Sequence, residues 1–300
     1  MMIIEMPRLV VVLGPTAVGK TGIAIQLARH FQTEILSADS RQFFREMKIG
    51  TAAPSMEELN AAPHHFIGHL SIHDPYNVSR FETDALKELT TLFTRQNVVL
   101  LSGGSGLYIN AVCHGIDPLS DPDPELRKQL KDMLQNSGIG ALQKQLQRLD
   151  PDYFLQMDQN NPVRLIRALE VTLATGMPFS SLRTQVPKPR PFTIIKIGLY
   201  LPRPVLNERI DHRVDRMMEA GLLREAESLY PHRHLNALNS VGYKELFDYF
   251  EGKHSIETAV EKIKTNTRRY AKRQMTWFRK DPSIAWYTPD QLPEIVLNLI

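Results

Sequence analysis

The sequence predicts an α/β fold, with a P-loop-type parallel sheet flanked by helices and an inserted all-helical domain. Two observations predict the sheet: short apolar runs alternate with helical stretches, and a glycine turn joins the first apolar run to a helix. A third observation, a helical stretch between two proline-rich linkers, predicts the insertion. We therefore expect a P-loop catalytic core of residues 1–114 plus 190–300 and a helical domain of residues 115–189.

Residues 9–22 (LVVVLGPTAVGKTG) predict a strand, a loop and a helix in that order. The spacing of Gly14, Gly19, Lys20 and Thr21 fits the phosphate-binding P-loop pattern. In such a loop, backbone N–H groups and a helix N-terminus face the phosphate, Lys20 supplies a cation and the Thr21 hydroxyl can ligate Mg²⁺. A chance strand-to-helix turn is the alternative. The ligand stays open between a nucleoside triphosphate and the diphosphate of any alcohol. The predicted phosphate-binding residues are Gly14, Pro15, Thr16, Ala17, Val18, Gly19, Lys20 and Thr21.

The composition predicts a globular protein of a reducing compartment. Its 300 residues are 42% hydrophobic and 23% charged, enough for one large domain or a domain plus an insertion. Cys113 is the single cysteine, which permits neither an internal disulfide nor a multi-cysteine zinc site. The apolar runs fall far short of the roughly 20 residues that span a bilayer. We expect a soluble cytoplasmic protein with no membrane partner, and the net charge of +3 is only a weak hint of nucleic acid.

Asp39 is the leading catalytic candidate. It follows a short apolar strand within residues 33–42 (TEILSADSRQ), and the ligand crevice of an α/β sheet lies at the carboxyl ends of its strands. A carboxylate there could hold Mg²⁺ through water or accept a proton from a nucleophile. A cap of the next helix is the alternative.

Two stretches between residues 47 and 107 narrow the function. His64, His65 and His69 could suggest a metal, but no acidic ligand at suitable spacing joins them until Asp74, so we favour a role without metal. A helix is expected at residues 81–95. The strand expected within residues 97–107 ends in SGGSG where ordinary P-loop NTPases carry a metal-binding aspartate, which argues against a motor or switch ATPase. These glycines would allow another chain or a ligand to approach the backbone closely.

Four motifs, in this order, resemble the tRNA dimethylallyltransferase (tRNA isopentenyltransferase) family: residues 14–21 (GPTAVGKT), 37–42 (SADSRQ), 49–52 (IGTA) and 103–108 (GGSGLY). Further matches extend the resemblance over most of the chain. Ala53 stands where many members carry lysine, so no contact of that lysine carries over. Ser105 stands where threonine is common, which preserves a hydroxyl. A single cysteine excludes the zinc finger of eukaryotic members, so the resemblance is to the bacterial type.

The resemblance implies transfer of the dimethylallyl group from its diphosphate to N6 of the adenine 3′-adjacent to the anticodon. The implied cofactor is Mg²⁺ at Thr21, and the implied partners are dimethylallyl diphosphate and the anticodon stem-loop of tRNA, bound by a monomer. Lys20 would neutralise the leaving group, Asp39 would take the proton of the amine, and the base would be extruded from its stack. Residues implied at the meeting place are Thr16, Asp39, Ser40, Arg41, Gln42 and Ser105.

The insertion is expected to carry further tRNA contacts. A proline and aspartate linker from residue 116 to 124 precedes helices expected at 125–135, 139–149 and 163–175, and VPKPRP at 186–191 closes the domain. Residues 161–170 (NPVRLIRALE) match the family's tRNA-contacting helix. Arg164 and Arg167 share one helix face, which without the resemblance reads equally well as a solvated pair. The implied contacts are Arg127, Val163, Arg164, Leu165, Ile166 and Arg167.

The chain then returns to the core through a strand at residues 192–201 and a helix at 203–220. This helix carries Arg209, Arg213 and Arg216 as a basic stripe, of which the family pattern selects Arg213 as the diphosphate contact. Residues 239–245 (NSVGYKE) match another family motif. That match implies tRNA contacts from Ser240, Val241, Gly242, Tyr243 and Lys244.

The helix expected at residues 255–280 is the strongest indication of nucleic-acid binding that does not depend on the family resemblance. Between Lys262 and Lys280 it holds eight Lys or Arg and no Asp or Glu. Its aromatic residues, Tyr270, Trp277 and Phe278, are expected in the core rather than as stacking surfaces. A strand at 284–287 and a helix at 292–300 complete the chain.

Two other classes of function stay open. A small-molecule kinase would use the same loop for ATP and Asp39 as the base for a hydroxyl, but the basic helix and the large insertion argue against it. A non-catalytic RNA-binding module would not need intact Lys20, Thr21 and Asp39.

Overall fold

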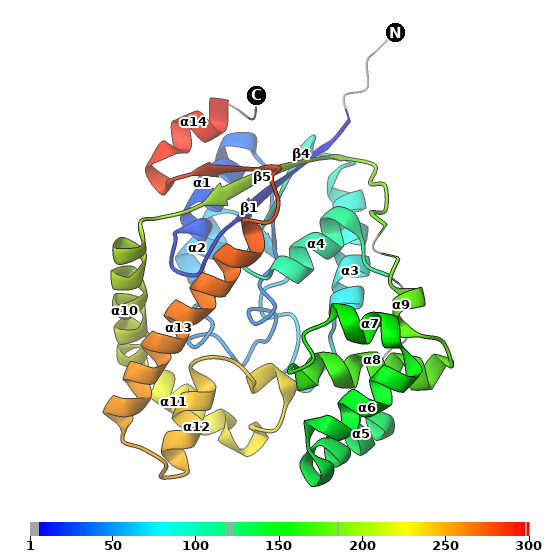
Figure 1. Cartoon of the computed structure of the whole chain (residues 1–300). Coiled ribbons are helices and arrows are strands. Elements are labelled where there is room, and N and C mark those ends of the chain that lie inside the picture. Colours follow the sequence, from blue (N-terminus) through cyan, green and yellow to red (C-terminus); the bar gives the residue numbers. More distant parts are fainter. Residues whose placement is uncertain (1–5, 118, 120–122, 185, 298, 300) are drawn as a thin grey trace. The chain divides into compact units, whose positions relative to one another are not determined.

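A computed structural model describes residues 6–117, 119, 123–184, 186–297 and 299. The chain divides into two compact units (Figure 1), a core unit of residues 1–113 and 190–300 and a helical unit of residues 114–189. The sequence analysis placed the first boundary between the units one residue later, after residue 114, and the second boundary at the same residue. Parts of the linker expected at 116–124 and of the helix expected at 292–300 lie outside the described residues. Across the described residues, every helix is too short or too polar to pass through a bilayer.

A six-stranded parallel sheet forms the centre of the core unit, in the order β3-β2-β4-β1-β5-β6. Central β1 pairs with β4 on one side and β5 on the other, and its five residues after Arg8 are all buried. Such apolar runs suit a strand that is covered on both faces. Because all strands run in one direction, their carboxyl ends meet at one edge. The strands are β1 (Arg8–Leu13), β2 (Ile35–Ser37), β3 (His64–His65), β4 (Val98–Gly103), β5 (Thr193–Leu199) and β6 (Ile284–Tyr287).

Helices pack on both faces of this sheet. Alternate residues of β1 divide between the faces: Val10 and Val12 pack with α1, and Val11 and Leu13 pack with α3 and α4. Helix α3 begins earlier than the sequence predicted, because the Asn77 side chain caps it. The helices of this unit are α1 (Lys20–Phe31), α2 (Met56–Ala61), α3 (Val78–Leu92), α4 (Gly106–His114), α10 (Arg203–Glu219), α11 (Leu222–Leu229), α12 (Tyr243–Phe250), α13 (Ile256–Phe278) and α14 (Leu292–Leu297).

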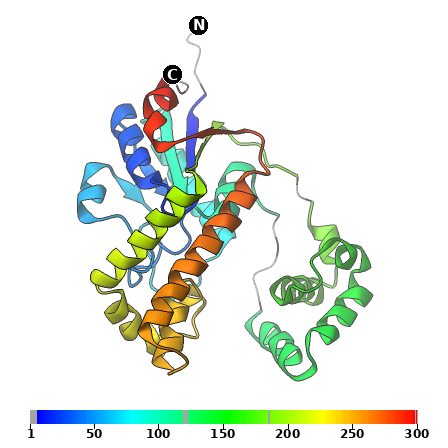
Figure 2. The same cartoon turned by 60° about the vertical axis from the view of Figure 1, so that its left-hand side comes forward.

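A third apolar cluster joins α10 to α13 away from the sheet. Helices α10 and α13 lie side by side in both views (Figures 1 and 2) and contact each other, with α11 and α12 at their far end. Tyr243 and Leu246 from α12 are fully buried here beside Val214 and Ile263. This cluster fixes α13 against α10, the helix that carries Arg213.

The helical unit has its own core. Three of the five helices described in this unit begin with proline after an Asp or Asn cap, namely Asp123, Asp150 and Asn161. Leu142, Leu146 and Leu165 are fully buried at its centre. The sequence predicted three of these helices and missed the two short ones. The helices are α5 (Pro124–Ser137), α6 (Ile139–Leu149), α7 (Pro151–Gln156), α8 (Pro162–Thr175) and α9 (Phe179–Leu182).

The two ends of the helical unit lie next to each other. The Lys188 N–H donates to the His114 carbonyl at 2.7 Å. On the core side, the Arg190 guanidinium donates to the carbonyls of Ala111 and Val112 at 2.7 and 2.8 Å and pairs with buried Glu82. The chain therefore leaves and re-enters the core unit at one place.

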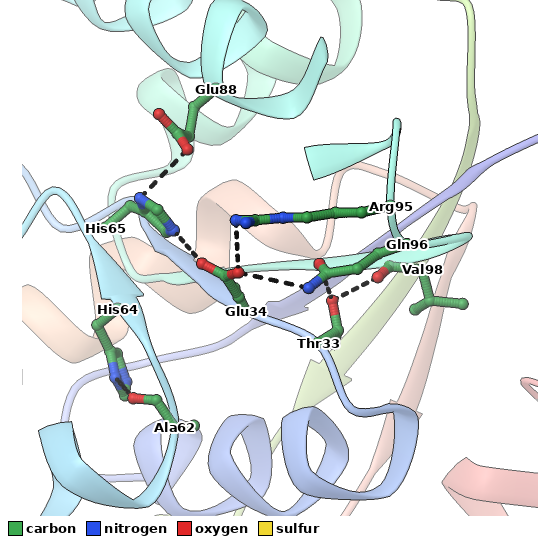
Figure 3. A network of polar contacts seen from close by, with 9 residues as sticks. All are labelled: Thr33, Glu34, Ala62, His64, His65, Glu88, Arg95, Gln96 and Val98. Carbon is green, nitrogen blue, oxygen red and sulfur yellow. Dashed lines mark hydrogen bonds and ion pairs between the residues drawn. The ribbon is translucent and has the colours of Figure 1, made fainter. Parts of the chain in front are cut away.

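The adjacent histidines stabilise the amino end of β2 (Figure 3). His65 Nε2 lies 2.7 Å from the Glu34 carboxylate, which also accepts from Arg95 at 2.7 Å, and His65 Nδ1 faces Glu88 at 3.5 Å. His64 contacts the Ala62 carbonyl instead. Among the described residues, no three His, Cys, Asp or Glu side chains form a group that could hold a metal ion. His65 therefore belongs to an ion-pair network, whereas His64 makes a backbone contact.

Candidate active site

The loop between β1 and α1 has the backbone of an anion-binding turn. Gly14 (φ 151°), Ala17 (φ 65°) and Gly19 (φ 106°) all have positive φ, and a Cβ at Gly14 would lie 2.6 Å from the Leu199 carbonyl oxygen. Glycine is therefore required at position 14. Helix α1 begins at Lys20 with no acidic residue in its first turn, so the positive end of its dipole points at the loop. Pro15 has no N–H group, which leaves its carbonyl as its only polar backbone group.

Three cations surround this loop. Lys20 Nζ donates to the Pro15 carbonyl at 2.8 Å, and Arg209 donates to the Val18 carbonyl at 3.4 Å. Burial lowers the pKa of Lys20 from 10.5 to about 8; the Asp39 carboxylate opposes this shift and Arg213 adds to it. Burial also lowers the pKa of Arg213, again opposed by Asp39. The contact from Arg209 is one that the sequence interpretation did not select.

Asp39 lies among these cations after the end of β2. Its carboxylate accepts the Arg41 N–H at 3.1 Å, so it caps a turn, whereas the sequence alternative was a helix cap. Next to it, the Ser40 N–H donates to Ser105 Oγ at 3.0 Å, and the two hydroxyls are 3.2 Å apart. Removal of its hydroxyl group from water raises the pKa of Tyr270 to about 12, although 36% of the residue is exposed, and the Asp39 charge adds to the shift. The partly buried Asp39 carboxylate is thus close enough to Lys20, Arg213 and Tyr270 to influence the pKa of each.

Arg41 and Gln42 connect this turn to neighbouring segments rather than pointing into open solvent. Arg41 donates to the carbonyls of Asn236 and Ala237 at 2.9 and 3.0 Å. Gln42 Nε2 donates to the carbonyls of Thr51 and Ala52 at 3.3 and 3.1 Å. The Thr51 carbonyl also accepts from Arg213 at 3.4 Å. The segment from residue 48 to 53 therefore positions both Gln42 and Arg213.

Glu225 in α11 holds that segment in place. Its carboxylate accepts the N–H groups of Lys48, Ile49 and Gly50 at 3.0, 2.8 and 2.8 Å. It also accepts the Tyr243 hydroxyl at 2.7 Å, and the Tyr243 ring fills the space that a Cβ at Gly50 would need. We call this group the Glu225 clamp. The sequence analysis did not identify this clamp, because Glu225 lies in a helix that was not predicted and nothing near it in the sequence marks its role.

The space beside the glycines at the end of β4 is filled by other segments of this chain. A Cβ at Gly103 would lie 2.3 Å from the Ala38 carbonyl oxygen, and one at Gly106 would lie 2.3 Å from the Trp277 indole. At Gly104 the same atom would meet the Gln274 amide at 2.3 Å. The segments that approach these glycines closely are Ala38, which follows β2, and Gln274 and Trp277 of α13.

Part of the charge on α13 is neutralised within the fold. Arg268 pairs with Asp211 of α10, and Lys264 pairs with Asp215 at 2.7 Å. Lys272 and Arg273 are exposed, as are Tyr270 (36%) and Trp277 (41%). Only Phe278 of the three aromatic residues is in the core, so the expectation that all three are core residues is wrong for the other two. The exposed face of α13 combines cations with aromatic rings.

The other expected tRNA contacts differ in exposure. Val163 (75%) and Arg164 are exposed on α8, whereas Leu165 and Ile166 belong to the core of the helical unit and their side chains are not available to RNA. Arg127 and Arg167 both pair with buried Glu170. In the motif at residues 240–244, Lys244 is exposed, Ser240 and Val241 are half-buried, and Gly242 and Tyr243 are buried.

The oxygen donors near the loop fit Mg²⁺ bound together with a phosphate. The Thr21 hydroxyl and the Asp39 carboxylate are oxygen ligands, the type that Mg²⁺ prefers. This ion usually keeps several waters and takes only one or two protein oxygens beside the phosphates of a substrate.

Comparison with known proteins connects this geometry to a family. The family model described as "IPP transferase" matches residues 42–281. This chain belongs to the IPP transferase family. The tRNA dimethylallyltransferase of Christiangramia forsetii is 53% identical over 97% of each chain, and tRNA dimethylallyltransferase 1 of Bacteroides fragilis is 48% identical over 97% of each chain.

Solved IPP transferase structures share the fold. The full-length tRNA isopentenylpyrophosphate transferase of Bacillus halodurans aligns with a TM-score of 0.72 at 36% identity and covers 97% of this chain and 95% of its own. A eukaryotic dimethylallyltransferase, described as acting on tRNA, aligns with a TM-score of 0.74 at 28% identity over 90% of this chain and 69% of its own. The sheet and its flanking helices are therefore those of this family. The kinase alternative is disfavoured.

Proposed function

We propose that this protein transfers a dimethylallyl group from dimethylallyl diphosphate to N6 of the adenine 3′-adjacent to the anticodon in tRNA. The observation that carries the proposal is a partly buried carboxylate, Asp39, facing two cations at a phosphate-binding loop. Family membership supports the reaction class. We further propose that it acts as a monomer on the anticodon stem-loop, in the cytoplasm where its single cysteine stays reduced.

The reaction breaks one bond and forms another. The C–O bond to diphosphate breaks and its electron pair leaves with the diphosphate, while N6 forms a bond to the allyl carbon. Lys20, Arg213 and the helix N-terminus stabilise the charge that grows on the leaving group. Mg²⁺ held by Thr21 would supply further positive charge to the diphosphate.

Asp39 serves as the proton acceptor. The N6 lone pair of adenine is delocalised into the ring, so the amine becomes a better nucleophile when its proton is taken as the C–N bond forms. Ser40 and Ser105 lie beside Asp39 and supply hydroxyl groups for the edge of the extruded base. The adenine must leave its stack because its N6 is not accessible to the enzyme while the base is stacked in the anticodon loop.

In the core unit we assign RNA contacts to the exposed cations of α13 and to Lys244, and in the helical unit to Val163 and Arg164. Lys272 and Arg273 carry charge that no acidic partner in the described structure neutralises, so they suit phosphate contacts. Replacing both by alanine should reduce the slope of log K against log salt by about 0.7–0.9 for each phosphate that the protein then leaves unneutralised. An unchanged slope would remove this helix face from the RNA surface.

Mass spectrometry tests the reaction directly. Unmodified tRNA, dimethylallyl diphosphate, Mg²⁺ and the protein should yield tRNA heavier by C₅H₈. Asp39→Asn should lower kcat by about 10²–10⁴-fold with little change in tRNA affinity, and Asp152→Asn, at an exposed aspartate of α7, serves as the control. No added mass in the presence of ATP hydrolysis would favour a kinase instead, and a loss of affinity at normal turnover would refute the role of Asp39.

A further inference from the structure

One buried amide joins the phosphate loop to the turn beside Asp39. Gln274 of α13 is 6% exposed. Its Oε1 accepts the Thr16 N–H at 2.9 Å, and its Nε2 donates to the Gly104 carbonyl at 2.9 Å. A side-chain amide can satisfy a backbone donor and a backbone acceptor together because it carries both an acceptor oxygen and a donor nitrogen.

The two backbone groups belong to the two halves of the candidate site. Thr16 lies in the loop that is proposed to hold the diphosphate. Gly104 precedes Ser105, whose hydroxyl accepts the Ser40 N–H at 3.0 Å next to Asp39. A Cβ at Gly104 would lie 2.3 Å from Gln274 Nε2, so only glycine fits between the turn and the helix at this position.

We propose that Gln274 is a positioning residue, which holds the phosphate loop and the Asp39 turn at the separation that the transfer requires. The inference rests on the proposed function. Bond formation needs the reacting atoms about 3–3.5 Å apart, and a misplacement of about 1 Å can lower a rate 10²-fold. Gln274 carries no charge and leaves Lys20, Arg213 and the exposed face of α13 unchanged. Its loss therefore lowers kcat rather than substrate affinity.

Two variants of similar length test this role. Gln274→Met fills the space without polar groups and should lower kcat about 10- to 100-fold, with the KM of each substrate within threefold of wild type. Gln274→Glu keeps an acceptor for Thr16 but presents a second oxygen to the Gly104 carbonyl, so kcat should fall there too. Gln26→Met, the same change at an exposed position of α1, should stay within twofold. Rates are divided by the folded fraction from circular dichroism, so a merely structural role would leave kcat unchanged.

The outcomes separate the inference from the function on which it rests. Failure of the wild type to transfer the dimethylallyl group overturns the proposed function. With an active wild type, kcat values of the Met and Glu variants within twofold of wild type overturn the inference. A fall in kcat matched by an equal rise in the KM of the donor also overturns it, because Gln274 would then contribute to binding alone. If the Met variant does not fold, the Glu variant decides.

Discussion

Removing the negative charge of Glu225 should loosen the segment that positions Arg213 and Gln42. The wild-type carboxylate has two acceptor oxygens for four donors: Oε2 takes the N–H groups of Lys48 and Ile49, and Oε1 takes the remaining two. A glutamine keeps one oxygen. Its NH₂ group can donate to the Tyr243 hydroxyl but leaves the Gly50 N–H without an acceptor.

The size of the effect follows from these bonds. Hydrogen bonds to a charged group contribute about 1.5–3 kcal/mol each, and neutral ones about 1 kcal/mol. Glu225→Gln loses one bond and weakens the other three, because none of them then involves a charged group, so we expect the free energy of unfolding to fall by about 3–5 kcal/mol. Tyr243→Phe loses one bond to the charged carboxylate and leaves three, so we expect a fall of about 1.5–3 kcal/mol. Since both changes act on one group, the double variant should lose less than the sum of the single variants.

Urea unfolding followed by circular dichroism measures these differences, and the transfer assay measures kcat. Glu227→Gln makes the same chemical change at an exposed position of α11 and should shift the free energy of unfolding by no more than about 0.5 kcal/mol. A Glu225→Gln protein as stable as this control would refute the clamp. Normal kcat in a destabilised variant would show that the segment does not position Arg213.

Two further predictions concern Lys20 and Gly103. Because the pKa of Lys20 is lowered to about 8, kcat/KM for the donor should fall as pH rises through about 8, and the pH profile of Lys20→Arg should lack that fall. The unfolded chain binds the extra proton between about 8 and 10.5, so the stability contributed by this residue should rise with pH across that window. Gly103→Ala should cost about 2–3 kcal/mol through its overlap with the Ala38 carbonyl, whereas Gly22→Ala, with nothing within 4 Å of the new Cβ, should gain up to about 1 kcal/mol on thermal unfolding.

The elements with a strong local signal were predicted well. The strand before Gly14, the α1 helix and the long α13 helix all appear, because apolar period and loop chemistry are encoded in neighbouring residues. The place of Asp39 beside the phosphate loop was also predicted, since parallel strands bring their carboxyl ends to one edge. The helices α2, α7, α9 and α11 were missed because each has only four to eight residues, too few turns for the apolar period to show.

The contacts that position the site could not be predicted from sequence periodicity. Glu225 lies 176 residues from its partner Ile49, and Gln274 lies 170 residues from Gly104. Nothing local marks a polar side chain that satisfies such distant backbone groups. The part of the α13 charge that remains free to contact RNA was overestimated for the same reason. Arg268 looked available in the sequence, yet its partner Asp211 lies on another helix.

The adjoining ends of the helical unit have an architectural consequence. Because the chain departs and returns where Lys188 meets His114, with Arg190 fastened to Ala111 and Val112, the inserted segment joins the core unit at a single junction. A short loop could bridge that junction and leave the strand order intact. Closing a loop costs free energy that grows only slowly with its length, so such a junction tolerates insertions of very different size. A change in the size of the inserted segment would thus leave the strands and the phosphate loop of the core unit unchanged.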